Sequence, residues 1–162
     1  MGESALLFDA IVRIDFFCLG LRGNPQNLTE ITFLPLQAEQ KPRSEPASVA
    51  VQQFRHWLKQ PDFVFTLPLV TAGTPFRQRV WKAISSIKHG ETRTYGDLAH
   101  VLKSSPRAVG GACGDNPFPI VVPCHRVVAK TPSFNAGLGG FAHHSDGLYL
   151  DIKRWLLERE RA

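Results

Sequence analysis

One stretch, residues 120–128 with the sequence IVVPCHRVV, limits most strongly what this chain can build. Apolar β-branched runs are typical of buried strands, so we expect a strand here that ends at the edge of a core. Cys124, His125 and Arg126 follow one another at that end. A thiol beside a base can act as a nucleophile, whereas a buried cysteine is often only a small apolar side chain. This stretch alone leaves both interpretations open.

A nucleophilic Cys124 would need a base, and the base would need an orienting acid. Adjacent residues on a strand point to opposite faces, so His125 would reach Cys124 only through a bend or a bridging water. A carboxylate should hold the second nitrogen of the imidazole. The sequence offers Asp115, Glu158 and Glu160 as candidates and does not choose among them.

The chain has three cysteines, Cys18, Cys113 and Cys124. An odd count, and a beginning without the basic and apolar parts of a signal peptide, predict reduced thiols in the cytoplasm, or in the nucleus of a eukaryote. No Cys-x-x-Cys or His-x-x-x-His spacing is present, so we expect neither a metal nor another cofactor. No apolar run approaches the length of a membrane span, which predicts a chain without a membrane partner.

The positive charge is confined to the second half of the chain. Residues 1–75 carry six Lys and Arg against seven Asp and Glu, whereas residues 76–162 carry thirteen against seven. A modest basic excess is often only a solvated face. Its confinement to one half nevertheless makes a polyanion the partner to test there.

Residues 1–72 predict a small α/β domain without visible chemistry, in which Cys18 and His56 are structural. Alternating and β-branched runs around a Gly-Asn-Pro turn predict a β-hairpin or meander at the start. Apolar residues at helical spacing, with Ser48 as N-cap, predict one helix. The expected elements are strands over residues 5–22, 28–34 and 63–69 and a helix over residues 49–58.

Residues 73–162 predict a second, mostly α-helical domain. Thr74 is placed to cap a helix with Pro75 at its first position, Thr94 caps a second helix, and Pro106 opens a third after a tight connection. Two short helices joined by a tight turn in the basic half match a helix-turn-helix. The expected helices cover residues 75–87, 95–102, 106–113 and 148–160.

The third of these helices carries Arg107 among small side chains. Small side chains let a helix come close to another backbone. That backbone could belong to the protein's own core or to DNA, and these residues do not distinguish the two. The small residues are Ala108, Gly110, Gly111 and Ala112.

Several motifs in one order resemble the O6-alkylguanine-DNA alkyltransferases, also called methylated-DNA–protein-cysteine methyltransferases. A set of motifs in series is far more specific than any one of them. The resemblance covers residues 73–160 and implies a ribonuclease-H-like α/β domain before a helix-turn-helix domain of winged-helix type. The motifs are GTPFRQRVW at 73–81, GETRTYGDLA at 90–99, RAVGGA at 107–112, NP at 116–117, PCHRV at 123–127 and KRWLLERE at 153–160.

The resemblance implies a monomeric DNA-repair protein that reverses damage directly. Its partner would be double-stranded DNA carrying O6-alkylguanine, with O4-alkylthymine left open as a further substrate. The damaged base would be flipped out of the helix and its alkyl group moved once to Cys124. The alternative is a non-catalytic, alkyltransferase-like protein that binds alkylated DNA, but such proteins replace the acceptor cysteine. A helix-turn-helix regulator and a thiol hydrolase are further alternatives from other classes.

The resemblance also implies roles for the residues around Cys124. Glu160 would orient His125, and His125 would deprotonate Cys124 through a water. Tyr95 would donate a proton or a hydrogen bond to the departing guanine, and Asn116 would brace the turn that holds the acceptor.

Further residues are implied to hold DNA and substrate. Arg107 would fill the gap that the flipped base leaves, and its helix would lie in the minor groove, where small side chains fit. The carbonyl of Val127 would accept from the guanine amino group. The residues implied to contact DNA are Thr94, Tyr95, Arg107, Ala108, Gly110 and Gly111, and those implied to line the substrate pocket are Val127, Phe141 and Ala142.

Overall fold

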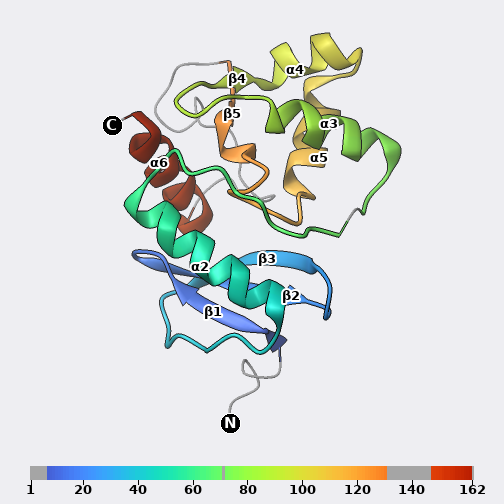
Figure 1. Ribbon diagram of the computed structural model, residues 1–162. Coiled ribbons are helices and arrows are strands. Elements are labelled where there is room, and N and C mark those ends of the chain that lie inside the picture. Colours follow the sequence, from blue (N-terminus) through green and yellow to red (C-terminus); the bar gives the residue numbers. More distant parts are fainter. Residues whose placement is uncertain (1–6, 71, 131–146, 162) are drawn as a thin grey trace. The chain divides into compact units, whose positions relative to one another are not determined.

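The computed structural model describes residues 7–70, 72–130 and 147–161 and shows a mixed α/β chain (Figure 1). The chain forms two compact units, Met1–Thr71 and Ala72–Ala162. None of the helices in the described residues combines the length and the apolar character that a membrane crossing requires.

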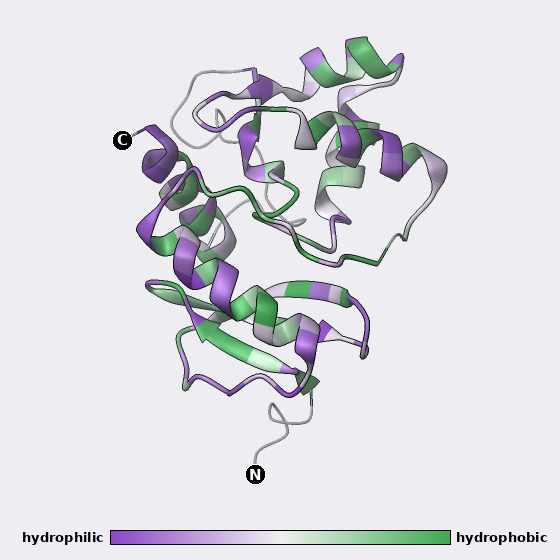
Figure 2. Ribbon diagram, viewed as in Figure 1, coloured by the Kyte–Doolittle hydropathy of each residue, from purple (hydrophilic) through white to green (hydrophobic). Residues whose placement is uncertain are grey.

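The first unit is a three-stranded antiparallel sheet with one helix against it. The strands β1 (Ala10–Arg13), β2 (Phe17–Gly23) and β3 (Leu28–Pro35) lie in the order β1-β2-β3, which confirms the expected meander. Helix α2 (Glu45–Lys59) contacts β1 and β2. In Figure 2 the ribbon of α2 alternates between hydrophobic and hydrophilic colours, as expected for a helix with one buried face.

Three expectations for this unit are wrong in detail. The predicted strand over residues 5–22 is two strands, because the chain turns between them and the N–H of Ile14 bonds the carbonyl of Phe17 at 3.0 Å. Helix α2 begins before the expected Ser48, because Ser44 caps it and a proline is tolerated in the first turn. Residues 63–69 form no strand and make one isolated bridge, between Leu28 and Leu69.

The second unit is mostly helical. Three expected helix starts are confirmed, since Thr74, Thr94 and Ser105 each accept a hydrogen bond from a backbone N–H of the first helical turn. Lys103 takes the left-handed conformation (φ 54°) in the tight connection. The elements are α3 (Pro75–Ser85), β4 (Arg93–Thr94), α4 (Tyr95–Leu102), α5 (Pro106–Gly114), η1 (Cys124–Arg126), β5 (Val127–Val128) and α6 (Gly147–Arg161).

The expected strand that starts at Ile120 and ends in Pro-Cys-His-Arg is also wrong. Cys124 begins the single 3-10 turn η1, and only the two residues of β5 are in a strand. The β-branched run cannot extend because prolines flank it at positions 119 and 123 and Ile120 has a φ of 75°. Strand β5 pairs in parallel with β4, and this pairing places η1, the turn that begins with Cys124, next to the start of α4.

Candidate functional site

Cys124 lies buried at the first position of η1, with 3% of its surface exposed. Asn116 holds this turn, because its side-chain nitrogen donates to the carbonyl of Val122 at 2.9 Å and to the Cys124 sulfur at 3.2 Å. The Asn116 side-chain oxygen accepts from the N–H of Phe118 at 2.9 Å. The amide is therefore fixed with its donor face toward the sulfur, the orientation that favours a thiolate.

The resting form of Cys124 is the thiol. A hydrogen bond with Cys113, and then burial, raise the pKa of Cys124 well above its usual range, against the opposing effects of Asn116 and Lys153. A thiol that stays protonated is a weak nucleophile. A nucleophilic Cys124 would therefore need a base to remove its proton.

His125 and Glu160 are paired in the way that a base and its orienting acid would require. The His125 Nε2 and Glu160 Oε2 atoms are 3.1 Å apart, and His125 is 1% exposed. Burial lowers the pKa of His125 despite the opposing pull of Glu160, so the ring is neutral at pH 7 with its hydrogen on Nε2. Its Nδ1 is buried and makes no hydrogen bond to any described residue. That nitrogen has a lone pair free to accept a proton.

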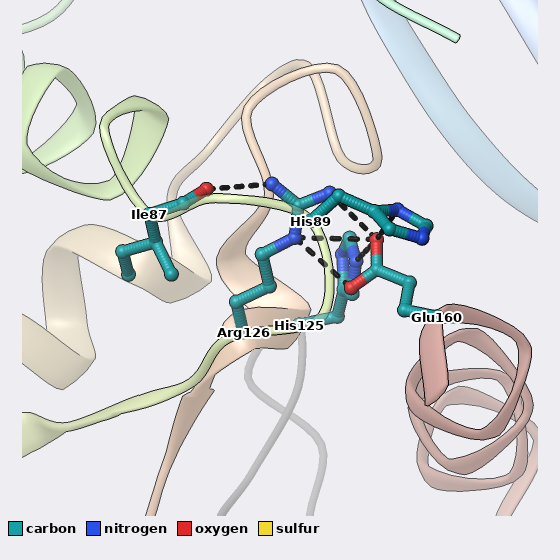
Figure 3. A network of polar contacts seen from close by, with 5 residues as sticks. All are labelled: Ile87, His89, His125, Arg126 and Glu160. Atoms are coloured by element: carbon teal, nitrogen blue, oxygen red, sulfur yellow. Dashed lines mark hydrogen bonds and ion pairs between the residues drawn. The ribbon is translucent and has the colours of Figure 1, made fainter. Parts of the chain in front are cut away.

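Glu160 also binds the residue after the histidine (Figure 3). Nη2 of Arg126 lies 2.6 Å from Glu160 Oε2 and its Nε 2.9 Å from Oε1, while its Nη1 donates to the carbonyl of Ile87 at 2.7 Å. The Nδ1 atom of His89 lies 3.7 Å from the same carboxylate. Burial alone would raise the pKa of Glu160, but the hydrogen bonds and charges of His125 and Arg126 lower it to about 2.

The geometry selects Glu160 from the three carboxylates that the sequence offered. Asp115 is paired with Arg77 at 2.7 Å, and Glu158 is exposed. Glu160 is the penultimate residue of α6, in the last turn, where a negative charge opposes the helix dipole. The ion pair with Arg126 offsets that unfavourable placement.

We expect this carboxylate to make folding stability fall in acid. Its pKa in the folded chain lies below the ordinary value of 4.5, so ionised Glu160 stabilises the fold above about pH 4.5, and this contribution disappears as the pH falls through about 2. The gap of about 2.5 pH units corresponds to about 3 kcal/mol. Urea unfolding of the wild type and Glu160→Gln across this range measures it. The difference between the two should shrink as the pH falls, and a constant difference would contradict the assignment.

Tyr95 begins α4, directly after the residue that pairs with Val128. Burial, with smaller effects from Cys113 and Cys124, raises the pKa of Tyr95 far above its usual value. Its hydroxyl therefore stays protonated at neutral pH and can act as a donor. Tyr95 is thus a protonated hydroxyl near enough to Cys124 for the thiol to affect its pKa.

Lys153 is a buried charge to which the sequence analysis assigned no role. It is 0% exposed, and its Nζ donates to the carbonyl of Val127 at 2.7 Å and lies 5.7 Å from the centre of the Tyr95 ring. Burial lowers its pKa to about 8, against the opposing effects of Cys113 and Cys124. An ammonium ion here at pH 7 would stabilise a thiolate at Cys124.

The residues expected to contact DNA lie on α5 and at the start of α4. Arg107 and Ala108 are exposed. A Cβ atom added to Gly110 would meet the Tyr95 ring at 3.9 Å, an ordinary contact, and one added to Gly111 would meet no described atom within 4 Å. Close packing within the described residues therefore does not explain these two glycines. Thr94 caps α4 with its hydroxyl oxygen, which accounts for its presence without DNA.

The two pocket residues predicted in the loop before α6, Phe141 and Ala142, lie outside the described residues.

The sequence analysis assigned no role to Lys153, Arg126 or His89. Arg126 could have been suspected, because it directly follows the cysteine and histidine. His89 carried no signal, since it belongs to the turn after α3, far in sequence from Glu160. No group of three metal-ligating side chains occurs among the residues that the structure describes.

Comparison with known proteins connects this geometry to a family. Residues 75–162 match the family described as 6-O-methylguanine DNA methyltransferase, DNA binding domain. A constitutive methylated-DNA–protein-cysteine methyltransferase of Bacillus subtilis is 43% identical over 114 residues, covering 69% of this chain and 64% of the relative. A probable enzyme of the same name from Acanthamoeba polyphaga mimivirus is 42% identical, with 66% of each chain covered. The chain thus spans about two thirds of the length of these relatives.

A mycobacterial protein matches over more of the chain. The methylated-DNA–protein-cysteine methyltransferase of Mycobacterium tuberculosis is 36% identical over 151 residues, 89% of this chain and 86% of the relative. The solved structure of Mycobacterium tuberculosis OGT in complex with DNA superposes with a TM-score of 0.73 at 34% identity, covering 94% of this chain and 91% of that one. On these matches, the chain belongs to the 6-O-methylguanine DNA methyltransferase family.

Proposed function

We propose that this chain repairs O6-alkylguanine in double-stranded DNA by moving the alkyl group to Cys124 in a single turnover. The observation that carries this proposal is the buried contact of 3.1 Å between His125 and Glu160, beside a thiol that is itself held by Asn116. Such a group of thiol, base and acid fits covalent catalysis. The names of the relatives supply the substrate class, and the solved complex of a relative with DNA supplies the partner.

The chemical step is a displacement at the alkyl carbon. His125 Nδ1 takes the proton of Cys124 through a water, and Glu160 stabilises the imidazolium that results. The sulfur forms a bond to the alkyl carbon as the bond between carbon and guanine O6 breaks. Tyr95 donates a hydrogen bond or its proton to the departing guanine. Because the pKa of Tyr95 is raised, its hydroxyl keeps that proton until the guanine becomes a base.

The product explains why one molecule would act once. A thioether contains no leaving group that water displaces readily, so the alkylated sulfur stays alkylated. The raised pKa of resting Cys124 suits a residue that can be used only once, because a thiol reacts with other electrophiles more slowly than a thiolate does. Cys124 would then lose its proton to His125 only when the flipped alkylguanine is bound beside it.

DNA would be held by α4 and α5 acting as a helix-turn-helix in a winged-helix-like domain. Helix α5 would enter the minor groove, because Gly111 leaves open space where another residue would place a Cβ atom. Exposed Arg107 would fill the gap left by the flipped base, with Thr94, Ala108 and Gly110 at the groove. Residues 73–162 would thus be the DNA-binding and alkyl-acceptor domain, and residues 1–72 a ribonuclease-H-like one.

The Val127 carbonyl would accept from the guanine amino group. It already accepts from Lys153 at 2.7 Å, but a carbonyl oxygen has a second lone pair for this purpose. A chemistry that rests on a free thiol requires a reducing compartment, so cytoplasmic or nuclear location is part of the proposal. The non-catalytic alternative is not favoured, because the acceptor cysteine is present.

The test counts repaired bases against protein molecules. A duplex containing O6-methylguanine is incubated in excess over the protein, and the guanine restored is measured until the reaction stops. We expect one guanine per protein molecule, and none with Cys124→Ala. Continued turnover would overturn the single-use mechanism, and tight binding without repair would establish the non-catalytic alternative.

Replacing Arg107 by alanine should slow repair of duplex DNA about 10-fold, because extruding the base without a side chain to fill the gap costs more free energy. Reaction with free O6-benzylguanine, which needs no base flipping, should be unchanged. The measurement is the ratio of the two rates, with Arg107→Lys as the control that keeps the charge. Equal losses on both substrates would remove Arg107 from the base-flipping step.

A further inference from the structure

A second histidine lies beside the acid of the proposed site. The Nδ1 atom of His89 is 3.7 Å from Oε2 of Glu160, the same oxygen that faces Nε2 of His125 at 3.1 Å (Figure 3). A distance of 3.7 Å is slightly too long for a hydrogen bond, and Nδ1 of His89 is buried without a hydrogen-bond partner among the described residues. The proposed alkyl transfer does not use His89.

The turn that carries His89 is held against both α6 and η1. Gly90, the next residue, has a φ of 84°, and a Cβ atom added to it would lie 3.5 Å from the backbone oxygen of Glu160. Ile87, two residues before His89, accepts from Nη1 of Arg126 at 2.7 Å. The backbone on both sides of His89 therefore fixes its place beside the carboxylate.

The oxygen that His89 approaches already has its full set of donors. A carboxylate oxygen offers about two lone pairs. Oε2 of Glu160 accepts from Nη2 of Arg126 at 2.6 Å and from Nε2 of His125 at 3.1 Å. The arginine is also anchored on Oε1, where its Nε donates at 2.9 Å. A further donor at His89 would therefore weaken the bond to His125 before the bonds to the arginine.

We propose that His89 is a positioning residue whose protonated form competes with His125 for Glu160 and so slows alkyl transfer in mild acid. This inference rests on the proposed function and adds a control of its base. A neutral ring can carry its hydrogen on Nε2, which leaves the carboxylate to His125. A protonated ring carries hydrogen on both nitrogens, so an N–H and a positive charge face Oε2. Imidazole is the side chain whose ordinary charge change lies near neutral pH.

The charge of His89 acts in the same direction as the competition. Against the effect of burial, His125 and Arg126 already lower the pKa of Glu160 to about 2, so no further cation is needed to ionise it. A positive His89 instead opposes the imidazolium that forms at His125 when Cys124 loses its proton. The His89 side chain is 29% exposed and that of His125 only 1%, so protons from solvent reach His89 first.

Among the residues that the structure describes, Glu160 is the one acid with an oxygen within 4.0 Å of the His89 ring nitrogens. Glu91, in the same turn, pairs instead with Arg93 at 3.3 Å. A change in the charge of His89 therefore acts first on Glu160. The charged and titratable groups on the elements packed around His89 are Glu160, Arg159 and Arg161 from α6, His125 and Arg126 from η1, and Lys88 and Glu91 from its own turn.

The test is the pH dependence of alkyl transfer to the full chain from free O6-benzylguanine, which needs neither DNA nor base flipping. Single-turnover rates are measured from about pH 6 to about pH 8, on either side of the ordinary charge change of imidazole. His89→Gln, which carries no charge, should match the wild type at the upper end and react about 3-fold to 10-fold faster than it at the lower end. His89→Lys, a cation throughout, should be slower than the wild type by a similar factor at the upper end.

His100→Gln is the matched control, because it makes the same substitution at an exposed position of α4, and it should follow the wild type at every pH. His89→Phe, also uncharged, repeats the comparison if the glutamine variant unfolds more easily in urea. A packing role alone would change the rate by one factor at every pH. That result, or a His89→Lys protein as fast as the wild type throughout, would overturn the inference and leave the proposed function intact. A wild type that transfers nothing at any pH would overturn both.

Discussion

Replacing Glu160 by glutamine should slow alkyl transfer about 10²-fold, the effect expected when a base loses its orienting acid, and should cost about 3 kcal/mol of stability. The glutamine keeps the shape but not the charge. His125 then forms its imidazolium without a carboxylate beside it, and Arg126, which makes two of its hydrogen bonds to Glu160 shorter than 3 Å, is left without a counter-ion. Single-turnover rates and urea unfolding measure the two effects.

Glu158→Gln is the matched control, because it removes the same charge from an exposed position on the same helix. It should change the transfer rate and the stability little. A Glu160→Gln protein that loses stability but keeps its transfer rate would show that the carboxylate only holds Arg126. That outcome would remove Glu160 from the proposed chemistry.

Replacing Lys153 by methionine should slow alkyl transfer about 10-fold to 100-fold, because one positive charge near the nascent thiolate is removed. Methionine fills a similar volume and leaves the Val127 carbonyl without its donor at 2.7 Å. Stability should change little, because an ammonium whose pKa burial lowers to about 8 is costly to bury. The rate should also lose its dependence on a group that titrates near pH 8.

Lys82→Met removes the same charge from an exposed position on α3 and is the control for net charge. A pH–rate profile with free O6-benzylguanine separates the two variants without DNA binding. If Lys153→Met reacted as fast as Lys82→Met at every pH, the buried ammonium would have a packing role alone.

The helical part of the second unit could be predicted closely from the sequence. Thr74, Thr94 and Ser105 are short polar side chains placed just before apolar periodic runs, and two of them precede a proline that suits the first helical turn. Such signals are local, so one sequence is enough to read them. The mostly helical character and the tight turn at Lys103 follow from them.

The acceptor turn could not be predicted in the same way. Its β-branched residues favour a strand by composition, but the two flanking prolines and the backbone of Ile120, at a φ of 75°, make a tight irregular turn. That conformation depends on contacts such as the amide of Asn116 on Val122, which local patterns do not encode.

Residue types alone could not choose among the carboxylates, and only the family resemblance implied Glu160; the burial of Lys153 was not predicted at all. Asp115, Glu158 and Glu160 look alike as residue types, and only the packing of α6 against η1 puts one of them on His125. Lys153 stands on the same helix as ordinary surface charges, and its neighbour Arg154 pairs with Asp151 on that helix. Long-range packing, rather than propensity, decides these positions.

Mapping the transferred methyl group tests directly whether Cys124 is the acceptor. The wild-type chain is reacted to completion with a duplex containing O6-methylguanine, digested, and each cysteine peptide is weighed. We predict one methyl group on the peptide of Cys124 and none on those of Cys18 and Cys113. A methyl group on Cys113, or restored guanine without any methylated peptide, would contradict the central claim.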